Sequence, residues 1–295
     1  MIKKFALLTL SGRLPAFAVV FSFLALALIF PLASVVSGAA LVSVTLHAGL
    51  RNGAVVVAMS ALALTMACYA FFGNPVIGLY AAIAQLTPSL ILAAIFRSTR
   101  SLDITLQAAA VIGALVFIVL DIALPTNAAF WQQVLGQILE PIFQAGTMSP
   151  ADVESSIATL SEYMTGIMVL SIVLVHSSLI FLGYWLNCVA QDNQQYKEEF
   201  KNIRLGKVLA LLALALTLAA LALQSSTLAQ LAGIMAILFC IPGMTFIHTL
   251  CASMTNSKLW LIISYLLVIF VPQVIVIIVL LGLFETFFGL RNKIN

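Results

Sequence analysis

The chain has 295 residues, of which 63% are hydrophobic and 8% are charged; an ordinary soluble domain has about 25% charged residues. A mean hydropathy of +1.18 excludes a soluble globular protein, because one core cannot hide that much apolar surface. In lipid, by contrast, about 20 consecutive apolar residues satisfy one bilayer crossing, and each helix bonds its own backbone groups. The composition therefore predicts an all-α polytopic transmembrane helix bundle whose first partner is the lipid bilayer.

Charge and motifs exclude several function classes. The net charge of +3 is spread in short clusters, so no nucleic-acid-binding face is predicted. The four cysteines form no C-x-x-C pair and have no histidine at zinc-ligand spacing, which favours small apolar side chains over a metal site. There is no P-loop, H-E-x-x-H or G-x-S-x-G motif. The sequence thus predicts neither an enzyme nor a cofactor.

The first element is an apolar run at residues 14–30, preceded by the cations Lys3, Lys4 and Arg13. This order is also that of a signal peptide, but more apolar sequence follows at once and no polar mature domain appears. We expect an uncleaved first span that ends at Pro31.

Further apolar runs follow in chain order and give about nine candidate spans, with eight or ten as alternatives. They lie at residues 31–50, 54–72, 76–96, 104–124, 164–189, 208–223, 229–250 and 259–283. The second and seventh spans are short. The last stretch, 259–290, would measure about 48 Å as one helix against a hydrocarbon core of about 30 Å. It must therefore bend near Pro272 or lie partly along the interface.

Lys and Arg indicate the orientation, because cytoplasmic loops carry their excess. With the N-terminus inside, all of these cations except Arg291 and Lys293 fall on the cytoplasmic side of the nine-span model. The connection 125–163 contains neither Lys nor Arg, as expected of an outer loop. The sequence predicts a multi-pass protein of a bacterial cytoplasmic (inner) membrane with a cytoplasmic N-terminus.

The outer connection is itself patterned. Apolar residues between Phe130 and Phe143 recur at three- and four-residue steps, which predicts an amphipathic interfacial helix. Ser149-Pro150-Ala151-Asp152 then predicts the start of a second helix, with an N-cap, a proline at the first position and an acidic third residue. Two interpretations stay open: helices resting on the membrane surface, or a lid over an outward-facing cavity.

Several short segments resemble one family. They are Phe30-Pro31-Leu32, Leu46-His47-Ala48-Gly49-Leu50-Arg51-Asn52-Gly53, Pro88 before Arg97-Ser98-Thr99-Arg100-Ser101-Leu102, and Leu281-Gly282-Leu283-Phe284-Glu285 before Leu290-Arg291. Their order resembles the YybS-type family of uncharacterised bacterial polytopic membrane proteins, in which an Asp often replaces Glu285. The likeness covers nearly the whole chain.

That family is similar to the S components of energy-coupling-factor transporters, which have six spans with a short second one. The resemblance implies a ligand cavity opening outwards and an ATPase module docking from the cytoplasm. It divides the chain into an S-component-like bundle at 1–189 with the outer loop 125–163, a cytoplasmic polar linker at 190–207, and additional C-terminal spans and a tail at 208–295. No motif matches a particular vitamin-binding set, and the extra spans depart from a compact S component.

Two ionisable residues inside predicted spans are candidate ligand contacts, since such a side chain costs about 2.5 to 3.5 kcal/mol in hydrocarbon. His176 lies near the middle of the sixth span, and Asp121 lies in the last turn of the fifth. Alternatively, His176 bonds a neighbouring helix and Asp121 is simply hydrated. Their depths differ by roughly 13 Å at the helical rise per residue, so they are not predicted to pair.

Neutral polar positions complete the candidate site. Gln85 and Gln107 are candidate ligand contacts, while Pro88, Pro272 and Gln273 mark candidate kinks or gates. A proline frees a carbonyl in the preceding turn, which a neighbouring amide can satisfy. The same amides also suit plain bridges between helices.

The sequence favours transporter-like capture or translocation of a small solute, with a small-molecule ligand and a cytoplasmic ATPase or other membrane subunit as partners. The alternative is a non-transporting membrane partner or assembly factor, which the absence of a recognisable coupling-ion site favours.

Overall fold

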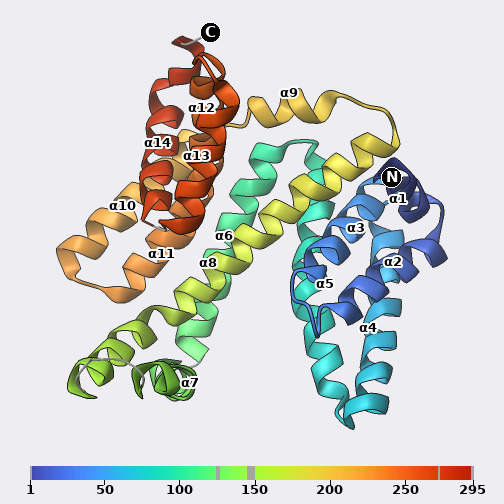
Figure 1. The fold of residues 1–295 in the computed structure, drawn as a ribbon, viewed down its shortest axis with the longest axis horizontal. Helices are drawn as coiled ribbons and strands as arrows, with labels where there is room; N and C mark the ends of the chain where they lie inside the picture. The colour runs from blue at the N-terminus through green and yellow to red at the C-terminus, as the bar shows by residue number, and fades with distance from the viewer. Residues whose placement is uncertain (1, 124–126, 145–149, 272, 294–295) are drawn as a thin grey trace. The chain divides into compact units, whose positions relative to one another are not determined.

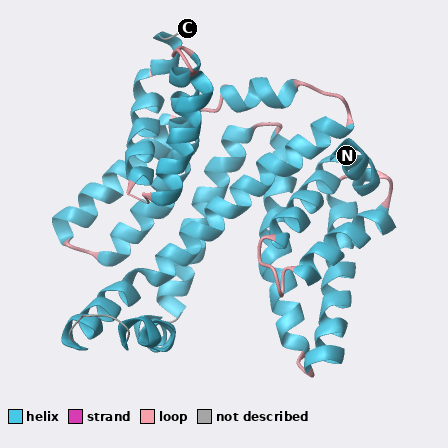
Figure 2. Ribbon diagram, in the orientation of Figure 1, coloured by secondary structure: helices cyan, strands magenta, loops and turns pink. Residues whose placement is uncertain are grey.

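The computed structural model describes residues 2–123, 127–144, 150–271 and 273–293 of the chain. All regular elements in these ranges are helices, which confirms the predicted all-α class (Figure 2). The chain divides into two compact units: unit 1 comprises Met1–Ala108 and Val175–Ile203, and unit 2 comprises Ala109–Leu174 and Arg204–Asn295. The units are interleaved along the sequence, since two helices, α6 and α8, contribute to both.

The helices follow in this order (Figure 1): α1 (Ile2–Leu10), α2 (Arg13–Leu26), α3 (Ala33–Ala48), α4 (Leu50–Phe72), α5 (Pro75–Thr99), α6 (Leu102–Ala123), α7 (Asn127–Gln144), α8 (Pro150–Ala190), α9 (Gln195–Lys201), α10 (Lys207–Leu223), α11 (Ser226–Ala236), the 3-10 turn η1 (Ile237–Phe239), α12 (Cys240–Ala252), α13 (Ser257–Phe270), α14 (Val274–Phe288) and the 3-10 turn η2 (Leu290–Lys293).

Five described helices are long and apolar enough to cross a membrane, which corrects the prediction of nine spans. They are α4, α5, α6, α8 and the continuous stretch Ser226–Ala252; α1 and α2 would add a sixth, but they meet at 120°. The predicted spans 31–50 and 208–223 form helices of 16 and 17 residues. Such helices are about 24 to 26 Å long, shorter than a hydrocarbon core of about 30 Å.

The last predicted span is broken at the expected place. α13 ends at Phe270 and α14 begins at Val274, while Pro272 itself lies outside the described residues. Val271 has an extended backbone, with φ −128° and ψ 83°, as expected of a residue that precedes proline. Both short helices contact α12, which has only 13 residues, so the chain doubles back instead of continuing in one direction.

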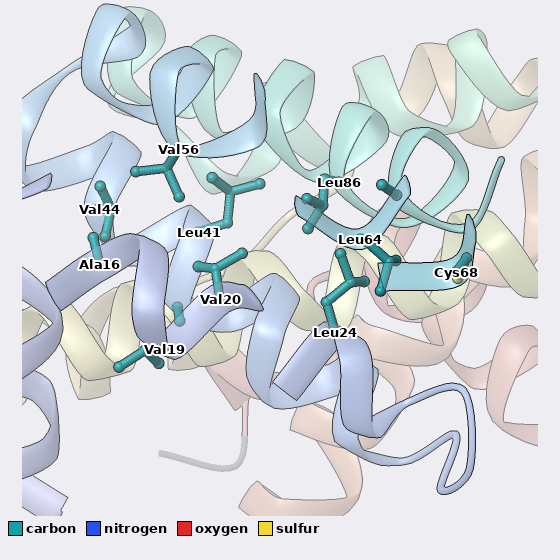
Figure 3. Packing of buried hydrophobic residues seen from close by; sticks show 12 residues of the cluster. Ala16, Val19, Val20, Leu24, Leu41, Val44, Val56, Leu64, Cys68 and Leu86 are labelled. Atoms are coloured by element: carbon teal, nitrogen blue, oxygen red, sulfur yellow. The ribbon is translucent and has the colours of Figure 1, made fainter. Parts of the chain in front are cut away.

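Unit 1 is built around α3. All residues from Ser37 to Thr45 are buried, and most of them are small, which allows neighbouring helices to approach closely. α2, α4 and α5 all contact α3. On α8, a Cβ added at Gly183 would lie 2.4 Å from Val42 of α3. Figure 3 shows Leu41 of α3 between side chains of α2 and α4 in this core.

Residues Asn127–Gln144, which include the predicted amphipathic segment, form the helix α7, and the helix predicted to start at Pro150 begins there. The latter is continuous with the predicted sixth span, so α8 has 41 residues and is about 61 Å long. In unit 2, the Trp131 indole of α7 donates to the Thr165 hydroxyl of α8 at 2.9 Å. The lid interpretation of α7 stays a prediction.

The polar linker after α8 contains a short helix with an aromatic side. The rings of Tyr196 and Phe200 in α9 contact Tyr184 and Phe181 of α8. Burial raises the pKa of Tyr196 above its ordinary value. Aromatic packing therefore holds α9 against the end of α8 within unit 1.

Candidate functional site

A polar cluster joins α3, α5 and α8 in unit 1. His176 of α8 is 4% exposed, and its Nε2 lies 3.2 Å from the Gln85 carbonyl of α5. Because a carbonyl only accepts, this hydrogen bond requires a proton on Nε2. The Gln85 side chain in turn donates from Nε2 to the Ser34 carbonyl of α3 at 3.1 Å. The structure thus brings together two of the four predicted ligand residues.

The candidate kink Pro88 lies next to this cluster. Helix α5 continues through Pro88 from Pro75 to Thr99, although a proline removes one backbone hydrogen bond and strains the preceding turn. In that turn the Gln85 carbonyl also accepts from the Ser89 hydroxyl at 3.2 Å. These donors from α5 and α8 bind the carbonyl next to that of Ala84, which is the one that loses its helical donor at Pro88.

Ser177, the residue after His176 in α8, has a buried hydroxyl without a partner. Its side chain is 1% exposed, and its hydroxyl makes no hydrogen bond within the described part of the chain. Serines in helices usually satisfy the hydroxyl on a carbonyl one turn earlier. A buried unsatisfied hydroxyl costs free energy, so each case needs a physical explanation.

The other predicted site residues lie elsewhere. Asp121 belongs to unit 2, where it accepts from the Thr227 hydroxyl at 3.3 Å. Gln107 is half-buried on α6, and no hydrogen bond to the polar cluster is found for it among the described residues. Gln273 is exposed at the start of α14, and Pro272 lies outside the described residues. The structure shows no contact that gives Gln273 a gating role.

Sequence reasoning missed a buried ion pair in unit 2. Glu285 of α14 accepts from Arg291 Nε at 2.7 Å and from the Arg291 backbone N–H at 3.0 Å. The side chains of Glu285 and Arg291 are 2% and 9% exposed. Arg291 also donates to the Thr245 hydroxyl of α12 at 3.0 Å. The missed signal was Gly289, whose left-handed conformation ends α14 and allows the chain to turn Arg291 back towards Glu285.

A second missed residue is Gln230 of α11. Its Nε2 donates to the Glu162 carbonyl at 3.0 Å, and its Oε1 accepts from the Gly166 N–H at 2.8 Å. These two backbone groups are four residues apart, so they are the acceptor and the donor of one α-helical hydrogen bond of α8. Gln230 carried the same signal as Gln85 and Gln107, a polar amide within an apolar predicted span. Its partners could not be read from the sequence, because they lie on another helix.

The apolar helices and these interior polar contacts define an all-α multi-pass membrane protein. No family model, no curated protein and no solved structure matches the chain. The function therefore has to be argued from the side chains described above.

Proposed function

We propose that the protein captures or translocates a small polar solute across a bacterial cytoplasmic membrane, with its N-terminus on the cytoplasmic side. The solute contacts Gln85, His176 and Ser177 in unit 1. The observation that carries the proposal is the Ser177 hydroxyl, which is buried without a partner in the described part of the chain, one residue after the buried His176 of α8. Both features are costly within apolar helices, and a bound polar molecule would offset part of that cost.

The chemistry of the cluster suggests the kind of solute. It offers an imidazole, a serine hydroxyl and the backbone carbonyl of Gln85. These groups are hydrogen-bond donors and acceptors rather than carboxylates or guanidinium groups. They suit a neutral polar solute better than an inorganic ion.

The resemblance to the YybS-type family and to S components supports the same function. It adds an ATPase or another membrane subunit as a cytoplasmic partner, for which the polar linker after α8 is the accessible segment. Within this proposal the short helices α3 and α10 are also inserted in the bilayer, and α13 and α14 enter and return as a pair. With the α1–α2 pair counted as one crossing, the chain crosses the membrane eight times, and α13 and α14 form a re-entrant pair at the end.

The experiment is native mass spectrometry of the full-length protein released gently from its host membranes. The wild type is expected to retain a stoichiometric small molecule, and Ser177→Ala and His176→Ala to lose most of it. Removing an unsatisfied hydroxyl leaves folding stability unchanged or raised, so loss of the molecule in Ser177→Ala is not explained by unfolding.

Two matched variants control for the chemistry of the change. Ser60→Ala removes another buried hydroxyl without a partner in the described chain, on α4. His248→Ala removes an imidazole that bonds the Tyr265 hydroxyl in unit 2. Both are expected to retain the molecule. A wild type without any small molecule, or equal loss in the controls, contradicts the proposal.

The second candidate is a non-transporting partner or assembly factor. The bonds of Gln230 and of the Glu285–Arg291 pair favour it, because they tie neighbouring segments into fixed arrangements. In the same experiment this function predicts a bound protein subunit and no retained metabolite.

A further inference from the structure

A hollow in unit 1 lies where the α1–α2 turn meets the α3–α4 turn. It has a volume of about 110 Å³, and its polar lining comes from Thr9, Arg13, His47 and Asn52. The lining contains a guanidinium and an imidazole but no carboxylate. The hollow is therefore suited to an anion.

Arg13 is held in place with most of its donors unused. Its Nε donates to Asn52 Oδ1 at 2.7 Å, and Asn52 in turn donates to the Ala48 carbonyl. Asn52 thereby fixes the plane of the guanidinium while leaving both terminal nitrogens without an acceptor among the described residues. A planar guanidinium with free terminal N–H groups matches the oxygens of a phosphate group.

Two other cations of unit 1 already have acceptors within the protein. Lys3 forms an ion pair with Asp192, and Arg97 donates to carbonyls at the end of α3. Arg13 has no carboxylate partner within the described ranges. The positive charge at this hollow is therefore not neutralised by the protein.

The start of helix α2 adds to the positive electrostatic potential at the hollow. Helix α2 begins at Arg13 after Gly12, which provides no side-chain cap. The first N–H groups of a helix carry partial positive charge when they are not bonded within it. Gly12 lines the hollow and has φ 155°, which favours glycine, so the backbone there is not covered by a side chain.

We propose that this hollow binds a phosphate group, with Arg13, His47 and Asn52 as the binding residues. Its volume of about 110 Å³ has room for one phosphate group. The neighbouring Lys3, Lys4 and Arg51 place it at the predicted cytoplasmic surface, where anionic lipid headgroups and free phosphate are both present. The proposal does not depend on the solute site in the polar cluster.

The test is thermal unfolding of the full-length protein in micelles of a neutral detergent. Four additions are compared separately. Two are lipids, dioleoyl phosphatidylglycerol and dioleoyl phosphatidylcholine, and two are salts of equal ionic strength, inorganic phosphate and sodium chloride. Phosphatidylglycerol is expected to raise Tm more than phosphatidylcholine does. If inorganic phosphate also raises Tm above chloride, a phosphate group alone is recognised; if it does not, the ligand is the lipid headgroup.

Variants locate the effect. Arg13→Gln is expected to weaken the apparent affinity for the stabilising ligand about tenfold, as for loss of one charge-assisted hydrogen bond. His47→Gln, which leaves the Arg13–Asn52 bond intact, is expected to weaken it less. The control is Arg51→Gln, an exposed cation of the same segment that does not line the hollow. Equal loss in Arg13→Gln and Arg51→Gln, or no Tm increase with either phosphatidylglycerol or phosphate, overturns the proposal.

Discussion

Gly166 and Gln230 are joined by a hydrogen bond of 2.8 Å from the backbone N–H of Gly166 to Oε1 of Gln230. The contact exists only because position 166 has no side chain: an added Cβ would lie 2.6 Å from Gln230 Cγ. In unit 2, a side-chain amide thereby ties α11 to the middle of α8.

Gly166→Ala is therefore expected to destabilise the protein. The added methyl group pushes Gln230 away and leaves its buried amide with poorer partners, at a cost of about 1 to 3 kcal/mol. Thermal unfolding in detergent micelles measures the effect.

The control for this change is Gly136→Ala in α7. A Cβ at Gly136 has no atom within 4 Å, and alanine favours a helix over glycine by up to about 1 kcal/mol. Gly136→Ala should leave stability unchanged or raise it. An equal loss of stability in both variants would show that the Gly166–Gln230 contact does not matter.

The buried Glu285–Arg291 pair predicts strong coupling between two residues. Glu285→Gln or Arg291→Gln alone is expected to cost about 3 to 5 kcal/mol, since each leaves the other charge buried without its partner. The double variant Glu285→Gln with Arg291→Gln should be less destabilised than the sum of the two single changes, because neither charge is then left without its partner.

A double-mutant cycle of unfolding free energies checks this expectation. A matched cycle on the exposed Lys3–Asp192 pair should give a coupling of at most about 1 kcal/mol. If the changes in unfolding free energy at Glu285 and Arg291 were additive, the ion pair would not contribute to the stability of the folded protein.

Arg97 predicts a stability effect at the end of α3. Its guanidinium donates to the Leu46 carbonyl and lies 3.5 Å from the carbonyls of Thr45 and His47. A cation at a helix C-terminus stabilises the unpaired carbonyls. Arg97→Leu is expected to cost about 1 to 2 kcal/mol in thermal unfolding.

The exposed Arg51 provides the comparison, because Arg51→Leu removes the same charge from the neighbouring helix. Its effect should be within about 0.5 kcal/mol. If Arg51→Leu were as destabilising as Arg97→Leu, net charge rather than capping would be responsible.

The break between α13 and α14 predicts the side of the C-terminus. In the proposed re-entrant arrangement, α13 and α14 return the chain to the side from which it came, so Arg291 and Lys293 are expected on the cytoplasmic side. A reporter fused after Asn295 that is active only in the cytoplasm should give signal. Activity of a periplasmic reporter at the same position would instead mean an odd number of crossings.

The sequence predicted much of the local structure, and the reason is physical. Local features depend only on a residue and its near neighbours. They include the apolar runs, the amphipathic period of α7, the start of α8 at Pro150 and the interruption near Pro272. Solvation in lipid and the covalent restrictions of proline act at that range.

The number of membrane spans was harder to predict from the sequence, because the length of a helix does not follow from hydropathy alone. The apolar run 31–50 reads as a crossing, yet α3 has only 16 residues. Its burial among α2, α4 and α5 compensates for the short length, because its neighbours rather than lipid surround it. The packing that makes this helix viable is not visible in its own sequence.

By itself, then, the sequence determined that this is an all-α membrane protein and where many of its helices start and stop. Only the tertiary structure decided which polar residues act together. His176 meets Gln85 across 91 positions, Gln230 meets Gly166 across 64, and Asp121 belongs to a different unit from His176. Such pairs depend on which helix faces meet, and no local periodicity encodes the partner of a buried hydrogen bond.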